Sequence, residues 1–389
     1  MLNCIPKDQN NPQICPFNLF AEQINGSAFT APRENNLKSW LYKIFPSASH
    51  NDYKNVDQNT FKNWISDFND KGKTKVVPNQ MRWSAPTLEN KCNLIEGIFT
   101  YSGAGSPELK EGMAIHGFIC NKSMEKESFY NADGDMLIVI QKGELYFQTE
   151  MGLLTVVPNE IIIIPRGIKF SVLVKEESSG WISEIYKGHF TLPGLGPIGA
   201  NGLANPRDFL IPTAFYKSSN ESHTVYCKYI GEFFSYEINH STYDVAGWTG
   251  NYYPFKYDLN KFCVINTVSF DHPDPSIFTC LTAQTDEKGV AVCDFVIFPS
   301  RWMVAENTFR PPYFHRNCMS EFMGNIKGKY DSKGKNFSPG CSSLHLIMTA
   351  HGPDKDSFEK GINEQLIPKK QIDTLSFMFE TTYMLKTTP

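Results

Sequence analysis

Four of the nine histidines of this 389-residue chain lie close together in its last third, with acidic residues among them. His315 and Glu321 belong to the string F-H-R-N-C-M-S-E-F, and His351 begins H-G-P-D. His345 lies between these two motifs, and His272 precedes them in D-H-P-D-P. Imidazole nitrogens and a carboxylate in one segment suggest a site for a divalent metal ion.

Two histidines and one carboxylate form the facial triad of non-haem Fe(II) enzymes, which leaves coordination positions open for substrate and O2. If His315 and Glu321 share a strand, their even spacing points both side chains to one face. His351 must then come from another strand or loop. The spacing is not specific, because Zn2+ accepts the same ligands, and a lone histidine is more often an ordinary core or surface residue.

Two further residues have both a structural and a catalytic interpretation. His272 lies in a segment that reads as a turn, in which two prolines fix the backbone and two aspartates cap it. Alternatively, it is a general base held rigidly at a strand end, with an adjacent carboxylate that raises its basicity. Tyr330 follows two lysines and is either rim packing or a hydroxyl donor to a polar substrate group.

Composition excludes several classes of protein. A net charge of -4 gives no electrostatic reason to expect a nucleic acid or an anionic membrane as partner. The first residues lack the apolar region of a secretory signal, and the longest apolar runs are too short to span a bilayer. The ten cysteines form no C-x-x-C pair and read as reduced thiols. We therefore expect a cytoplasmic protein.

Short β-type runs bounded by Gly, Pro, Asn or Asp dominate from about residue 94, and this pattern predicts an all-β fold with few short helices. Helices are expected at 37–44 and 354–362. The string Gly194-x-Gly196-x-x-Gly199 contains Pro197 and lacks a strand–helix context, so it predicts a loop and not a dinucleotide site. The expected strands are 95–101, 136–140, 145–149, 154–157, 161–164, 170–174, 225–230, 263–270, 290–298 and 375–379.

The glycine and proline spacing of residues 133–167 resembles one half of a cupin barrel, with turns at Gly143 and Gly152. Cupins usually carry metal-binding histidines near positions that are Asp133, Asp135 and Phe170 here. This half is therefore predicted to have no metal site of its own. We expect an irregular segment at 1–35, an N-terminal β domain at 36–255 and a C-terminal cupin-like catalytic domain at 256–389.

Long stretches of the chain resemble the homogentisate 1,2-dioxygenase family. The most specific are F-V-I-F-P-S-R-W at 295–302, F-R-P-P-Y-F-H-R-N-C-M-S-E-F-M-G at 309–324 and D-H-P-D-P-S-I-F-T at 271–279. Further matches lie at 10–30, 196–209 and 351–354, so the resemblance runs from about residue 10 to about residue 380. Family members usually begin earlier and continue past Pro389, and they differ at Phe314 and Ala350.

The resemblance implies a role for each residue singled out above. Its iron ligands fall on His315, Glu321 and His351, and its proposed base falls on His272. Tyr330, His345 and His351 fall on substrate-contacting positions, with His345 not binding iron. The family fold is a cupin-like double β-barrel or jelly roll, with the iron in the C-terminal barrel, and it assembles as a homohexamer built as a dimer of trimers.

The implied reaction is the Fe2+-dependent opening of homogentisate by O2, which gives maleylacetoacetate in tyrosine and phenylalanine breakdown. The phenol has a pKa near that of Tyr, about 10, so a base and a metal must make the phenolate accessible. Two other functions stay open. One is a zinc or manganese cupin isomerase with the same ligands and no need of O2, and the other is an inactive cupin-type binding protein.

Overall fold

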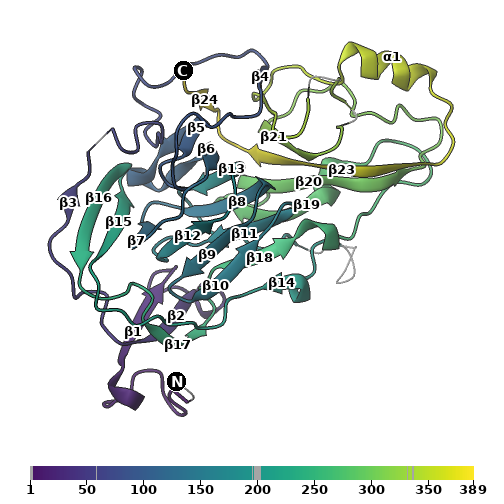
Figure 1. The fold of residues 1–389 in the computed structure, drawn as a ribbon. Coiled ribbons are helices and arrows are strands. Elements are labelled where there is room, and N and C mark those ends of the chain that lie inside the picture. Colours follow the sequence, from purple (N-terminus) through teal and green to yellow (C-terminus); the bar gives the residue numbers. More distant parts are fainter. Residues whose placement is uncertain (1–2, 58, 195, 197–202, 331, 335–336) are drawn as a thin grey trace.

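The structure, a computed structural model, describes residues 3–57, 59–194, 196, 203–330, 332–334 and 337–389. The strands in these ranges form four sheets (Figure 1). The three-stranded sheet lies at the N-terminal end and consists, in spatial order, of β1 (Phe20–Asn25), β2 (Lys38–Lys43) and β17 (Val245–Gly250).

The two large sheets come mainly from the first two thirds of the chain. The seven-stranded sheet has the order β10 (Gly152–Val156), β9 (Leu145–Thr149), β12 (Phe170–Val174), β7 (Glu127–Asn131), β15 (His223–Tyr229), β16 (Glu232–Ile238) and β3 (Lys54–Asn55). The eight-stranded sheet has the order β14 (Phe209–Leu210), β18 (Phe255–Asp258), β11 (Glu160–Ile164), β8 (Asp135–Lys142), β13 (Ser178–Ile185), β6 (Glu111–Cys120), β5 (Ile98–Ser106) and β24 (Lys386–Thr387).

The six-stranded sheet carries the predicted site. Its order is β19 (Thr279–Gln284), β20 (Ala291–Met303), β23 (Lys369–Thr381), β21 (Ser320–Lys327), β22 (Ser342–His345) and β4 (Met81–Trp83). Helix α1 (Lys355–Asn363) lies beyond its edge (Figure 1). Short 3-10 helices lie at Pro16–Asn18, Arg33–Asn35, Pro107–Leu109, Pro206–Asp208, Leu259–Lys261 and Pro275–Phe278.

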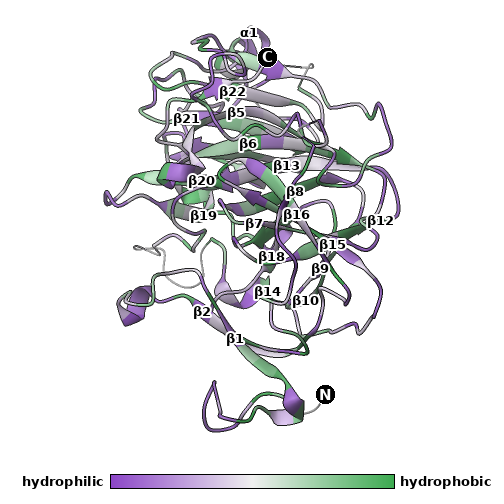
Figure 2. Cartoon of the chain, turned by 90° about the vertical axis from the view of Figure 1, so that its left-hand side faces the viewer, coloured by the Kyte–Doolittle hydropathy of each residue, from purple (hydrophilic) through white to green (hydrophobic). Residues whose placement is uncertain are grey.

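The eight-stranded sheet is the middle layer of the molecule. Along β8, Leu137 and Val139 pack into one core with residues of the six-stranded sheet, while Met136 and Ile138 pack into a second core with the seven-stranded sheet. Because successive side chains of a strand point to opposite faces, a strand buried on both faces must be apolar throughout. This requirement explains the continuous run Ile161–Ile164. Figure 2 shows hydrophobic residues concentrated on the central strands and hydrophilic ones along the outer loops.

The all-β class is confirmed, and so are most of the predicted strands. The runs at 136–140, 145–149, 154–157, 161–164 and 170–174 correspond to β8 to β12, and the turns at Gly143 (φ 81°) and Gly152 (φ 134°) use backbone that favours glycine. The predicted helix at 354–362 is α1. No described helix is long and apolar enough to cross a membrane.

Two element predictions are wrong. Residues 37–44 hold strand β2 instead of a helix, because this segment pairs with β1 on one side and β17 on the other. Residues 263–270 do not form a strand. Only Cys263 makes an isolated bridge, and Val268 and Phe270 are exposed, so most of this segment has no strand to pair with. The glycine string at 194–199 lies mostly outside the described residues.

The N- and C-terminal parts exchange edge strands. β4 pairs with β22 of the six-stranded sheet, and β24 near the C-terminus pairs with β5 of the eight-stranded sheet. The predicted border at 255/256 falls within β18. The division into domains stays a prediction.

Candidate metal centre

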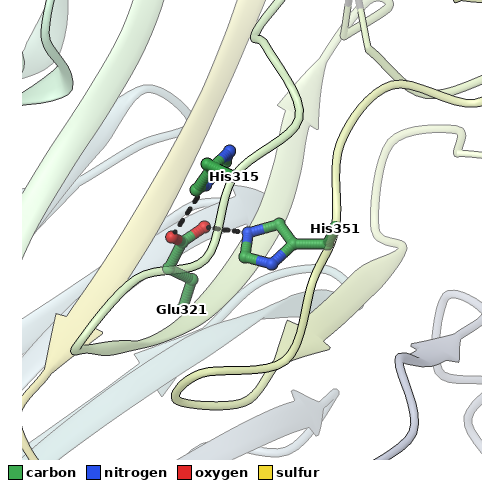
Figure 3. Close-up of side chains that lie close together, drawn as sticks. All are labelled: His315, Glu321 and His351. Carbon is green, nitrogen blue, oxygen red and sulfur yellow. Dashed lines mark hydrogen bonds and ion pairs between the residues drawn. The ribbon is translucent and has the colours of Figure 1, made fainter.

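Strand β21 and two loop segments bring His315, Glu321 and His351 together (Figure 3). Glu321 is the second residue of β21, whereas His315 precedes that strand. An isolated antiparallel bridge holds the two histidines side by side, with His315 N donating to His351 O at 2.9 Å and His351 N donating to His315 O at 3.0 Å. The assumption that His315 and Glu321 share a strand is therefore wrong, and this backbone bridge replaces it.

Both imidazoles point at the same carboxylate. His315 Nε2 lies 3.3 Å from Glu321 Oε1, and His351 Nε2 lies 3.2 Å from Glu321 Oε2. One ligand atom from each of the three residues lies within 4.8 Å of the others. Such spacing suits three ligands on one face of a metal ion.

The hydrogen bonds of the two imidazoles show that a cation fits between them. Nδ1 of His315 contacts the Tyr313 carbonyl at 2.8 Å, and Nδ1 of His351 contacts the Thr349 carbonyl at 2.9 Å. A carbonyl oxygen only accepts, so each Nδ1 carries a proton and donates it. In a neutral imidazole the Nε2 lone pair then faces the Glu321 carboxylate, which also only accepts. Either extra protons or one bound cation satisfies all these groups, and carbonyl-held histidines are usual at metal sites.

Glu321 is buried and held from a third side by Asn317. Asn317 Nδ2 donates to Glu321 Oε1 at 3.0 Å and to Glu380 Oε1 at 2.6 Å. Burial opposes ionisation of Glu321, but the two facing histidines, when they carry the extra protons, and the Asn317 amide hold its pKa well below the usual range. Burial raises the pKa of Glu380 to about 7, and the nearby Glu321 charge acts in the same direction. The site therefore keeps one anionic ligand and disfavours a second negative charge.

His345 is stacked on His351 and does not join the three. Its ring lies 4.3 Å from the His351 ring with an interplanar angle of 5°. Its Nε2 lies 3.3 Å from Lys333 Nζ, so Nε2 accepts and the proton of a neutral ring resides on Nδ1. That Nδ1 is buried, with no hydrogen-bond partner among the described residues. Register explains the placement, because His345 on β22 pairs directly with Glu321 on β21.

His272 lies near the three residues through Tyr313. The Tyr313 ring is 5.8 Å from the His272 ring and 5.5 Å from the His315 ring. His272 Nδ1 contacts the Pro273 carbonyl at 2.9 Å, which leaves its buried Nε2 without a partner among the described residues. The expectation that a neighbouring carboxylate raises its basicity is wrong. Burial lowers the pKa of His272, and Asp274 instead accepts from Ser276 N at 2.9 Å.

Tyr330 lies on the wall of a cavity of about 310 Å3 beside the site. The side chain is buried, with its ring 5.4 Å from that of Phe298. Lys333 lines the same cavity and also contacts His345, so the cavity wall adjoins the histidine pair.

The positions in the N-terminal half where cupins place ligands have other partners. Asp133 accepts from Lys228 Nζ at 2.6 Å and from the backbone of Ile230 and Gly231. Asp135 accepts from Arg166 and His189, and Phe170 packs in the core shared with the seven-stranded sheet.

Sequence reasoning missed Asn317, Lys333 and Glu380. Asn317 stands between two predicted ligands in H-R-N-C-M-S-E, and that position was the available signal. Lys333 is one of several lysines in its segment. Glu380 pairs with Glu321 only through the register of β23 against β21, which the sequence does not reveal.

Comparison with known proteins assigns the family. The model of the homogentisate 1,2-dioxygenase N-terminal region matches residues 1–259, and that of the C-terminal region matches residues 260–389. The homogentisate 1,2-dioxygenase of Mus musculus is 53% identical, over 99% of this chain and 86% of the mouse protein. That of Dictyostelium discoideum is 53% identical over 98% of this chain and 88% of its own length.

A plant relative and a solved structure complete the comparison. The Arabidopsis thaliana homogentisate 1,2-dioxygenase is 49% identical over 97% of this chain and 82% of its own length. A mutant of Bacillus subtilis oxalate decarboxylase OxdC is 13% identical with a TM-score of 0.33, over 82% of this chain and 81% of that one. That structural likeness is too weak to carry an argument, whereas the family models and the identities leave one assignment. The chain belongs to the homogentisate 1,2-dioxygenase family.

Proposed function

We propose that the chain opens the ring of homogentisate with O2 to give maleylacetoacetate, a step in tyrosine and phenylalanine breakdown. The observation that carries this proposal is the convergence of two imidazole Nε2 atoms on the Glu321 carboxylate in a chain of this family. His315, Glu321 and His351 would hold one Fe2+. When bound, the iron supplies a Lewis acid with open positions for a ring hydroxyl and O2.

His272 is the proposed general base. A phenol with a pKa of about 10 is mostly neutral at pH 7, so its proton must be taken up as the substrate binds. Nε2 of His272 has no partner among the described residues, and its lone pair is available because Nδ1 donates to the Pro273 carbonyl. Burial keeps this ring in the neutral form that can accept a proton.

Three residues would bind and orient the substrate. His345 offers an Nδ1 proton that has no other partner in the described part of the chain, Tyr330 offers a hydroxyl at the cavity wall, and His351 presents its ring beside His345. Holding the ring in one orientation raises the rate because the reacting groups need not find one another by diffusion.

The wider setting is also a proposal. We expect a cytoplasmic homo-oligomer, a hexamer made as a dimer of trimers, with no nucleic-acid or membrane partner. The segment at 1–35, which holds strand β1 and is therefore not irregular throughout, and a β domain at 36–255 without a metal site would support a catalytic domain at 256–389. Metal analysis would then give close to one iron per chain, and a ratio clearly above one in iron-reconstituted protein would contradict it.

Metal analysis and O2 uptake test the function. Purified chain is stripped with a chelator, reconstituted without O2 with Fe2+, Zn2+ or Mn2+, and mixed with homogentisate. Iron-loaded protein should consume O2 and substrate in equal amounts, and the zinc form should consume none. Turnover of the zinc or manganese form without O2 would indicate an isomerase, and metal-free protein that binds without reaction would indicate a binding protein.

A further inference from the structure

Glu380 stands directly opposite one of the proposed metal ligands. In the six-stranded sheet, the register of β23 against β21 pairs Glu380 with Glu321. Directly opposite residues project to the same face of a sheet, with their Cβ atoms about 4.5–5.5 Å apart. Two acidic side chains in such a pair repel each other when both are ionised, and this repulsion destabilises the sheet. A structural role alone does not explain an acidic residue at this position.

The Asn317 amide lies between the two carboxyl groups. Its Nδ2 donates to Glu380 Oε1 at 2.6 Å and to Glu321 Oε1 at 3.0 Å. A side-chain amide nitrogen carries two hydrogens, so the two acids use both of them. The amide oxygen accepts from Met319 N at 3.1 Å, which fixes the other side of the group. The amide therefore has one orientation that satisfies all its partners, with Nδ2 facing the two acids.

Glu321 depends on this amide for its own orientation. Its Oε1 faces His315 Nε2 at 3.3 Å and its Oε2 faces His351 Nε2 at 3.2 Å (Figure 3). With neutral rings and no cation, these two contacts bring lone pairs together and do not hold the carboxylate. The N–H of Asn317 does hold it, because it donates. A ligand that is held in position beforehand loses less conformational freedom when its partner binds.

Two mechanisms would let Glu380 affect the metal centre. It acts either through Asn317, as a hydrogen-bond acceptor, or through space, as a second negative charge. The geometry favours the first mechanism, because the bond from Asn317 Nδ2 to Glu380 is the shorter of the two that this atom makes. A carboxyl group also keeps an accepting oxygen whether or not it is protonated. The effect of Glu380→Gln differs between the two mechanisms.

We propose that Glu380 is a positioning residue for the metal centre. By accepting one N–H of Asn317, it keeps the other N–H on Glu321 and so holds the ligand carboxylate between the two imidazoles. This inference rests on the proposed function, because it takes His315, Glu321 and His351 as the metal ligands. Glu380 acts through Asn317 and not on the metal itself. Hydrogen bonds that orient metal ligands typically contribute about 10- to 100-fold to metal affinity.

The metal affinities of Glu380→Leu and Glu380→Gln test the proposal. Leucine removes the acceptor at a similar size, whereas glutamine keeps an accepting oxygen without the charge. Chelator competition without O2 or substrate should show that Glu380→Leu binds Fe2+ and Co2+ about 10-fold more weakly. The affinity of Glu380→Gln should stay nearer to that of the parent. The visible absorption spectrum of the Co2+ form, which reports ligand geometry, should change in Glu380→Leu and be restored in Glu380→Gln.

Asp294→Leu is the matched control. Asp294 pairs with Glu380 across β20 and β23, so it projects to the same face one strand further from Glu321. It is partly buried, as Glu380 is. Asp294→Leu therefore removes a similar carboxyl group without touching Asn317, and it should leave the metal affinity and the Co2+ spectrum unchanged. An equal loss of affinity in Asp294→Leu would overturn the specific role of Glu380.

A second substitution at Asn317 separates position from charge. In an Asn317→Ala background, Glu380→Leu should cause no further loss of metal affinity, because the amide through which Glu380 acts is absent. A further loss of the same size, or equal losses in Glu380→Gln and Glu380→Leu, would mean that Glu380 acts as a charge through space and would overturn the proposal.

The remaining outcomes also decide. Unchanged metal affinity in Glu380→Leu would make Glu380 a structural residue and end the proposal. If the leucine variant fails to fold, Glu380→Met removes the same acceptor with a more adaptable side chain, and the same comparisons apply. Parent protein that binds neither Fe2+ nor Co2+ would instead overturn the proposed function.

Discussion

Each half of the chain buries a glutamate among histidine, asparagine and other polar groups, and the two clusters differ in what they leave open. Glu184 accepts from Lys228 at 2.6 Å, His116 at 3.0 Å and Asn131 at 2.7 Å. The negative charge of the Glu184 carboxylate is thus balanced by the positive charge of Lys228. This network joins the eight-stranded sheet, which carries Glu184 and His116, to the seven-stranded sheet, which carries Lys228 and Asn131.

Among the described residues, no lysine or arginine pairs with Glu321 in this way. Its two histidine partners donate from Nδ1 to backbone carbonyls, so their Nε2 atoms meet the carboxylate without a proton between them unless one is added. Buried polar groups are normally satisfied, and an exception needs an explanation. The comparison indicates that similar residue types form a structural network where a lysine balances the carboxylate, and a candidate metal site where that positive charge is missing.

The largest expected effect comes from removing the anionic ligand. Glu321→Gln keeps the shape but leaves two neutral imidazoles and an amide, so iron should no longer be retained. Turnover should fall by more than the roughly 10- to 100-fold that loss of an outer-shell partner causes. Iron content and O2 uptake on folded protein measure this. A Glu321→Gln protein that is fully loaded with iron and active would remove Glu321 from the site.

His272→Ala should separate a base from a ligand. Loss of a general base typically costs about 10²- to 10⁴-fold, so turnover per iron should fall by that much with iron still bound. Neutral imidazole is the working form, so activity of the parent should fall on the acid side. Because burial lowers the pKa of His272, that limb should lie below about 6.5, the usual histidine value.

The controls for His272→Ala are the unfolding midpoint and the pH profile. If D-H-P-D-P is only a rigid turn, the variant loses stability but keeps near-normal turnover per bound iron, and the base assignment fails. Loss of iron would make His272 a ligand and require the metal site to be redrawn.

Lys228→Met tests whether the network around Glu184 stabilises the fold without affecting iron binding. Removing one partner of a buried charge cluster costs about 3–5 kcal/mol because the remaining charges stay buried. Chemical denaturation should show that loss at neutral pH, while iron per folded chain stays unchanged. Lys142→Met removes an exposed pair with Glu177 and should cost about 1 kcal/mol or less.

The pH dependence of Lys228→Met has a definite sign. Burial disfavours the charged form of Glu184, but Lys228 holds its pKa well below the usual range. A lowered carboxyl pKa stabilises the fold above the unfolded value of about 4.3 and loses that contribution below it. Since the variant lacks the ammonium, the difference in free energy of unfolding between the parent and the variant should become smaller as the pH falls through about 4. A loss of iron in Lys228→Met, or a loss of stability below about 1 kcal/mol at neutral pH, would contradict the structural role of Lys228.

Sequence reasoning succeeded where local pattern decides the outcome. The strands from β8 to β12 are apolar runs with glycine turns. The three residues proposed as ligands, His315, Glu321 and His351, do lie together, whereas their role as ligands stays a prediction. It missed long central strands such as β6 and β13, because buried polar residues interrupt their apolar pattern, namely His116, Ser183 and Glu184. It also missed contacts fixed by long-range pairing, among them Glu380 opposite Glu321.

An asparagine donates a hydrogen bond to each of the two buried glutamates, so the two asparagines can be compared directly. Asn317 Nδ2 donates to Glu321 at 3.0 Å, and Asn131 Nδ2 donates to Glu184 at 2.7 Å. Asn317→Ala should lower iron affinity about 10- to 100-fold, because an outer-shell hydrogen bond orients the ligand carboxylate. Asn131→Ala should leave iron affinity unchanged and cost about 1–3 kcal/mol of stability, because a buried charged acceptor loses a donor.

Competition with a chelator measures iron affinity for both asparagine variants, and denaturation measures their stability. Asn317 also accepts from Met319 N at 3.1 Å, so some loss of stability is expected there too. The decisive quantity is therefore the ratio of iron affinities measured on folded protein. Equal iron affinity in the two variants would mean that Asn317 does not orient a ligand. A weakened iron site in Asn131→Ala would mean that the closed N-terminal network and the open metal site are coupled through the middle sheet, and the contrast between them would have to be given up.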